Sequence, residues 1–106
     1  MNIKFNYLYR DAGNYKNYGS VIFANPNQLE IDYIESKIKE SLIDRSYFVA
    51  KDVSVPELYF AALNYDDHGW HEYCGIENTV EETRDGLGRG IDELIGMLEG
   101  CVKSEI

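Results

Sequence analysis

Seven consecutive residues hold the side chains of this chain that are best suited to chemistry. The segment reads DDHGWHE from Asp66 to Glu72, and it contains both histidines, His68 and His71, together with three carboxylates. Imidazole and carboxylate groups are ligands for zinc, manganese and iron. The spacing HxxHE matches neither HExxH nor HxxEH, and on a strand the two imidazoles would point to opposite faces. We therefore expect no metal and no other cofactor, and a metal site on His68 and His71 is the alternative.

Two further patterns resemble functional motifs without matching them. Cys74 follows His71 by three residues, which on a strand separates the thiol from the imidazole and disfavours a Cys–His catalytic pair. The run GLGRG from Gly86 to Gly90 precedes an expected helix, as phosphate-binding loops do, but it lacks the Lys-Ser/Thr of a P-loop. The sequence therefore predicts a protein without catalytic residues.

The charge of the chain favours a protein partner. Its formal net charge is −9, from 19 acidic and 10 basic residues, which disfavours nucleic acid and anionic membranes because both attract a basic face. Between Asp52 and Thr83 there are eight carboxylates and neither Lys nor Arg. This run is either a solubilising surface or a patch that docks on a basic protein. Both alternatives require only exposed carboxylates, so the sequence leaves them open.

Tyrosine is frequent, with nine residues in 106. Two tyrosines fall in a turn-rich connection near the N-terminus, and other aromatic residues flank the acidic segment. Tyr and Trp are common in interface hot spots because they combine a large contact area with a polar group. We therefore predict a partner-binding surface made of Tyr15, Tyr18, Tyr65, Asp66, Asp67, Trp70, Glu72 and Tyr73.

The elements that must position these residues follow from hydrophobic periodicity. Residues 3–9 alternate and residues 20–24 are rich in β-formers, which predicts a hairpin with a long, Tyr-rich tip. Apolar stripes at helical spacing predict helices over 30–42 and 91–102. Further strands are expected at 47–50, 57–65 and 70–77, of which 57–65 also fits a helix, and 78–90 is expected to be a mobile loop.

This order of elements predicts an α+β fold, in which two helices pack on one face of an antiparallel sheet of about four or five strands. A length of 106 residues is typical of a single domain over 1–106. No apolar run approaches the length of a membrane span, and the N-terminus lacks signal-peptide features, so we expect a cytoplasmic protein with reduced Cys74 and Cys101.

The run YRDAGNYKNYG at residues 9–19, followed by SLID, YFVA, VPEL and DDHGWHEY, carries a resemblance over about Lys4 to Thr79. The chain resembles a family of small bacterial proteins, abundant in cyanobacteria, with no assigned activity, so the resemblance supplies no catalytic residues to carry over. In size, acidity and tyrosine content it is also similar to immunity proteins, which present carboxylates and tyrosines to the basic cleft of a toxic nuclease. We therefore expect a non-catalytic, immunity- or antitoxin-like inhibitor of a basic protein such as a toxin. A metal-binding or enzymatic domain centred on DDHGWHE and a homodimeric structural module are the alternatives.

Overall fold

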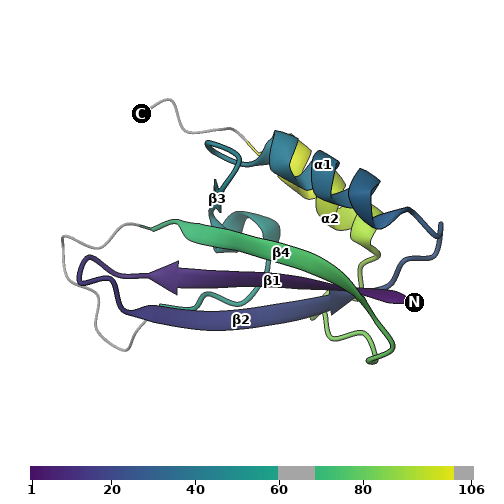
Figure 1. Ribbon diagram of the computed structural model, residues 1–106, viewed down its shortest axis with the longest axis horizontal. Helices are drawn as coiled ribbons and strands as arrows, with labels where there is room; N and C mark the ends of the chain where they lie inside the picture. Colours follow the sequence, from purple (N-terminus) through teal and green to yellow (C-terminus); the bar gives the residue numbers. More distant parts are fainter. Residues whose placement is uncertain (60–68, 102–106) are drawn as a thin grey trace.

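The computed structural model describes residues 1–59 and 69–101. Four strands form one antiparallel sheet in the order β2-β1-β4-β3, and two helices lie beside it (Figure 1). The expected α+β architecture is therefore confirmed. The elements in chain order are β1 (Asn2–Arg10), β2 (Lys16–Phe23), α1 (Ile31–Ser41), β3 (Tyr47–Phe48), the 3₁₀ helix η1 (Ala50–Val53), β4 (His71–Thr79) and α2 (Ile91–Gly100).

The central strand β1 separates two faces of the sheet. Its helix face carries Ile3, Phe5 and Tyr7, which are buried and pack against both helices. Its outer face carries the intervening residues from Asn2 to Arg10. The alternation predicted for residues 3–9 is confirmed, because successive side chains of a strand point to opposite faces.

The predicted hairpin of β1 and β2 is confirmed, but its loop is shorter than expected. The Asp11 N–H donates to the Tyr15 carbonyl at 3.1 Å, and the Asp11 carboxylate accepts from the Tyr15 N–H at 2.9 Å. These two bonds close the turn over residues 11–15, so β2 begins at Lys16. Tyr18 is consequently a strand residue opposite Leu8 rather than part of the tip.

Both helices form where their apolar stripes predict them. Ile34 and Ile38 are the buried positions of α1, and four apolar residues of α2 from Ile91 to Leu98 are buried. They meet Phe5 and other side chains on the helix face of the sheet. Within the described ranges, no helix is both long enough and apolar enough to cross a membrane.

The strand expected at residues 47–50 is shorter in the structure. β3 holds only Tyr47 and Phe48, and the chain then turns into η1. A 3₁₀ helix places residues three apart on the same side, which here buries both Ala50 and Val53 in the core. The predicted strand over 57–65 falls mainly on 60–68, outside the described residues, and 57–59 form no regular element.

The strand expected at residues 70–77 is confirmed as β4, which contains a β-bulge at Gly75. Tyr73 pairs with Tyr7 and Ile76 pairs with Phe5, so β4 has one residue more than β1 between these pairs. Gly75 has φ +104°, a conformation that favours glycine. The bulge keeps Tyr73 and Ile76 on the helix face, where both pack against the core.

Residues 80–90 lead from β4 past the outer face of the sheet to the edge of β2. The Lys4 ammonium contacts the Glu81 carboxylate at 3.3 Å, and the Arg84 N–H donates to the Ile22 carbonyl at 2.8 Å. Near the end of this segment, Arg89 forms a buried ion pair with Asp85 at 2.9 Å. These contacts do not measure motion, so the mobility expected for residues 78–90 stays a prediction.

Candidate functional site

An ion pair joins β1 and β4 on the outer face. Arg10, the last residue of β1, and Glu72, the second of β4, form two hydrogen bonds, Nε to Oε1 at 2.8 Å and a terminal nitrogen to Oε2 at 3.2 Å. The other terminal nitrogen donates to the Asn14 side-chain carbonyl in the hairpin loop. Hydrogen bonding to Glu72 raises the pKa of Arg10, so the guanidinium stays charged at neutral pH. This fork geometry fixes the direction of both side chains.

Two aromatic rings stand beside the ion pair. Tyr47 of β3 and Trp70, just before β4, have ring centroids 5.6 Å apart and planes inclined by 31°. Together with Arg10 and Glu72, they line an open cavity of about 410 Å³. A cavity of this size with apolar walls and a few fixed polar groups suits a side chain or small group of a partner.

Exposed tyrosines extend this surface across the hairpin. Leu8 pairs with Tyr18 on one side and with Glu72 on the other, and Glu72 pairs with Tyr47. These four residues therefore form a row across all four strands of the sheet. Tyr18 is 66% exposed, whereas Leu8 between its neighbours is buried. We call Arg10, Tyr18, Tyr47, Trp70 and Glu72 the outer-face site.

The structure brings together some of the residues predicted to bind a partner. Trp70, Glu72 and Tyr18 belong to the outer-face site, and Tyr15 is 72% exposed in the adjoining hairpin loop. Tyr73 lies on the helix face, where its hydroxyl donates to a Glu35 carboxylate oxygen at 3.0 Å. Tyr65, Asp66, Asp67 and the metal candidate His68 lie outside the described residues.

Arg10 and Tyr47 are part of the site although the sequence did not single them out as contacts. Both adjoin Glu72, through the pairing of β4 with β1 and with β3. Arg10 and Glu72 are 62 residues apart in the chain. A local pattern cannot reveal such a pairing. The sequence offered one signal for the pair. Arg10 and Glu72 lie at strand ends and carry opposite charges, and such side chains stabilise each other when their strands pair.

His71 is part of the core rather than of the outer-face site. It is fully buried on the helix face, where its Nε2 accepts a hydrogen bond from the Leu58 N–H at 2.9 Å. Tyr9 and Tyr59 lie against the imidazole, with ring centroids 5.2 Å and 5.1 Å from it. A nitrogen that accepts an N–H bond has no lone pair left for a metal. Across residues 1–59 and 69–101, no three metal-ligating side chains come together.

Cys74 lies three residues after His71 in β4, and the bulge begins only after Cys74. The two side chains therefore point to opposite faces of the strand. The Cys74 thiol is exposed. Partial desolvation and the nearby Glu72 carboxylate raise the pKa of Cys74. The thiol is therefore protonated at neutral pH, whereas a nucleophilic cysteine needs a lowered pKa.

The glycine-rich run before α2 does not present its arginine to a ligand. Arg89 is 5% exposed, and its guanidinium bonds Asp85 together with the carbonyls of Val53 and Ser54, at 2.6 Å and 3.0 Å. The N–H of Gly90 donates to the Glu93 carboxylate at 3.0 Å, which caps the helix. These contacts give the run a structural role at the start of α2.

Comparison of this chain with protein-family models, with curated proteins and with solved structures found no match.

Proposed function

We propose that this chain is a non-catalytic protein-binding domain that uses the outer-face site to dock on a basic protein. Its action would be occlusion, in the manner of an immunity or antitoxin protein that covers the active cleft of a toxin. The observation that carries this proposal is the cavity of about 410 Å³ between the Tyr47–Trp70 pair and the Arg10–Glu72 ion pair. Exposed Tyr18 extends the same surface.

The residue types at this site are those that supply most binding energy in protein interfaces. Trp, Tyr and Arg dominate hot spots because they bury large areas and retain a polar group. Arg10 and Glu72 already hold each other in place, so binding orders fewer side chains. The Glu72 carboxylate also has lone pairs beyond the two that Arg10 uses, and these can accept a Lys or Arg of the partner.

Charge supports a basic partner at long range and selectivity for that partner at close range. The net charge of −9 creates a long-range field that speeds encounter with a positively charged protein. At close range the outer face is mixed, because Lys4 and Arg10 lie beside Glu81 and Glu72. A mixed surface selects a partner with matching charges rather than any cation. Asp66 and Asp67 keep their predicted role as further carboxylates for this partner.

The metal-binding alternative has less support. It centres on the DDHGWHE segment, in which the His71 Nε2 accepts the Leu58 N–H in the core. Such a site would therefore depend on His68 and the neighbouring carboxylates.

A capture experiment tests the proposal. The chain is immobilised, incubated with an extract of the cells that make it, and eluted in salt steps from about 0.05 to 0.5 M, over which exposed charge pairs are progressively screened. We expect one basic protein to elute in stoichiometric amount. A Tyr18→Ala/Trp70→Ala bait should lose it, since each hot-spot residue contributes about 1–4 kcal/mol of binding energy.

The matched control is Val80→Ala, which removes an exposed apolar side chain outside the outer-face site. This bait should retain the partner. Thermal melting of all three baits verifies that they are folded. Equal capture by the double variant and the wild type would overturn the assignment of the outer-face site, and failure to capture any basic protein would overturn the proposed function.

A further inference from the structure

β4 is open along part of one side. It pairs with β1 along one side from His71 to Thr79, whereas β3 covers only His71 and Glu72 on the other. One more bond, from the Tyr73 N–H to the Ser46 carbonyl at 2.8 Å, lies at the end of that contact. In the part of the chain that the structure describes, no strand pairs with residues 75–79 on this side. An open edge of this kind can accept an extended chain as an additional strand.

The sheet register shows which backbone groups face the open edge. The Arg84 N–H donates to the Ile22 carbonyl from outside the sheet, so Ile22 does not use that carbonyl to bond its partner Lys4. The backbone groups of Lys4 must then face β4, where Lys4 pairs with Glu77. The backbone groups of Glu77 face β1 for the same reason, because antiparallel partners either both bond or both do not.

Ile76 and Asn78, on either side of Glu77, therefore direct their N–H and C=O groups to the open edge. An added strand would bond to these two residues. Side chains of directly opposed residues share a face of the sheet, and Asn78 lies on the helix face because it pairs with Ile3. The side chain of the added strand opposite Asn78 would therefore enter the space between the sheet and α1.

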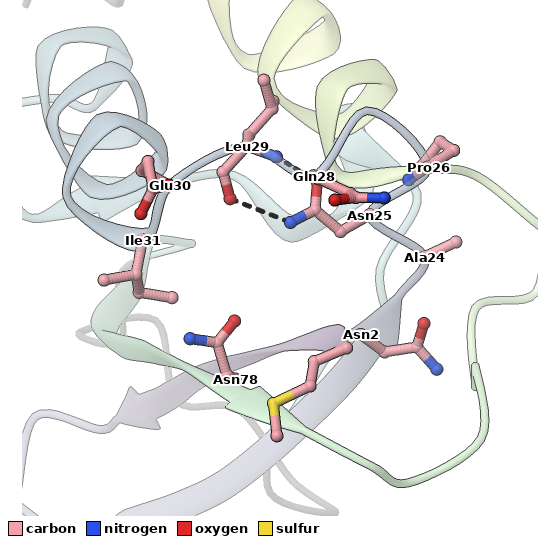
Figure 2. A pocket seen from close by; sticks show the side chains of 10 residues that line it. Asn2, Ala24, Asn25, Pro26, Gln28, Leu29, Glu30, Ile31 and Asn78 are labelled. Atoms are coloured by element: carbon pink, nitrogen blue, oxygen red, sulfur yellow. Dashed lines mark hydrogen bonds between the residues drawn. The ribbon is translucent and has the colours of Figure 1, made fainter.

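A cavity of about 560 Å³ occupies that space. Figure 2 shows Asn78 projecting from β4 toward Ile31 at the start of α1, with Asn2 and Gln28 at other parts of the wall. The Asn25 amide is held by two bonds to Leu29, both at 3.0 Å. Gln28, Glu30 and Asn78 line the cavity with polar groups that can hydrogen-bond a ligand. Leu29 and Ile31 give it an apolar wall.

The polar lining has the chemistry to recognise a cationic side chain. Glu30 supplies a carboxylate, and the amides of Gln28 and Asn78 supply carbonyl acceptors. Asp32 in the first turn of α1 adds negative charge nearby. A lysine or arginine has an apolar stem that can lie on Ile31 while its charged end reaches these acceptors.

We infer that the open edge of β4 binds an extended basic peptide segment as a fifth strand, with a Lys or Arg side chain opposite Asn78 entering the cavity beside Glu30. This site lies on the edge and helix face of the sheet, apart from the outer-face site, and does not rest on the proposed function. A second copy of the chain fits the edge poorly. Each copy carries a charge of −9, and edge-to-edge pairing would bring Glu77 of both copies close together.

The test uses a fluorescent peptide of about nine residues, the length of a typical long strand, in which valine and lysine alternate. Its binding to the full chain is followed by anisotropy. Two control peptides keep the length. One has glutamate in place of lysine, and the other is N-methylated at alternate residues along the edge that would pair with β4.

Two substitutions at Asn78 separate backbone from side-chain effects. Asn78→Pro removes the N–H that faces the open edge and costs no bond to β1, whereas Asn78→Ala keeps it. We expect Asn78→Pro to bind the lysine peptide at least about tenfold more weakly than Asn78→Ala, since about 1.4 kcal/mol corresponds to this ratio. Both control peptides should bind the wild-type chain as weakly as the lysine peptide binds the Asn78→Pro variant. If Asn78→Pro does not fold, the N-methylated peptide gives the same test on the wild type.

The cavity is tested with Glu30→Gln against Glu99→Gln, which removes an equal charge from the exposed side of α2. Glu30→Gln should weaken binding of the lysine peptide severalfold more than Glu99→Gln. The inference would be overturned if the lysine peptide bound Glu30→Gln and Glu99→Gln equally well, or Asn78→Pro and Asn78→Ala equally well. Either result would indicate unspecific electrostatic attraction. A wild-type dimer in sedimentation that Asn78→Pro dissolves would overturn it in favour of a second copy. Trp70→Ala should leave peptide binding unchanged, which separates this site from the outer-face site.

Discussion

Arg10 of β1 and Glu72 of β4 are joined by two parallel hydrogen bonds, at 2.8 Å and 3.2 Å. Both side chains are partly exposed, and pairs of this kind contribute about 0–1 kcal/mol to folding. Their main effect is on geometry. The pair lines the cavity together with Tyr47 and Trp70, so the outer face holds these polar groups in a defined direction.

A different ion pair should dominate stability. Replacing Arg89 by methionine leaves the Asp85 carboxylate, whose side chain is 2% exposed, without its cation. Breaking a buried pair costs about 3–5 kcal/mol, and we expect a loss of that size in urea unfolding. The exposed control Lys51→Met should change the unfolding free energy by less than about 0.5 kcal/mol. A loss for Arg89→Met no larger than that of the control would contradict the structural role of this pair.

Asp85 should also make the fold sensitive to acid. Hydrogen bonding to Arg89 holds the pKa of Asp85 below its ordinary value. A lowered folded-state pKa contributes stability that is complete above about pH 4 and is lost as the pH falls through the folded pKa. The difference in unfolding free energy between wild type and Asp85→Asn should therefore shrink from about pH 5 to about pH 2. A pH-independent difference would show that the carboxylate charge does not stabilise the fold.

Two glycines should respond in opposite ways to the same substitution. A methyl group at Gly75 meets no atom within 4 Å, but the φ of +104° disfavours alanine, so Gly75→Ala should cost about 1–3 kcal/mol. A methyl group at Gly96 of α2 also meets open space, and there alanine should add up to about 1 kcal/mol because it favours the helix. Thermal and urea unfolding measure both. Equal effects would argue against the bulge conformation of β4.

His71 should act as a structural acceptor. His71→Phe keeps an aromatic ring between Tyr9 and Tyr59 but removes the acceptor of the Leu58 N–H. An unsatisfied buried donor costs about 1–3 kcal/mol, and hydrogen exchange at the Leu58 amide should accelerate. Tyr59→Phe, which removes an exposed hydrogen bond to the Gly69 carbonyl, is the milder control. Unchanged exchange at Leu58 in His71→Phe would contradict this role.

Local periodicity predicted most of the fold. The alternation from Ile3 to Tyr9 and the stripe through Ile34 and Ile38 depend on neighbouring residues alone, and both are confirmed. The boundary between β3 and η1 does not depend on such a pattern. Propensity predicted a strand over residues 47–50, whereas the turn into η1 is fixed by distant contacts such as those of Arg89 with the Val53 and Ser54 carbonyls.

The candidate site shows the same division. Trp70 and Glu72 were predicted from residue type, whereas Arg10 and Tyr47 join them through strand pairing over long sequence distances. Tyr73 was predicted to accompany Glu72, although adjacent strand residues point to opposite faces. Its bond to Glu35 on the helix face follows from that rule. The alternation of side chains along a strand is enough to place Glu72 and Tyr73 on opposite faces, without knowledge of the rest of the fold.

The most direct test of the account is the affinity of the captured basic partner for the purified chain, measured by calorimetry for the wild type and for Trp70→Ala. We predict a weakening of at least about tenfold, or 1.4 kcal/mol, because Trp70 forms a wall of the cavity at the outer-face site. Melting curves of the variant provide the control for folding. An affinity within about twofold of the wild type, less than one hot-spot contact would give, would contradict binding at the outer-face site.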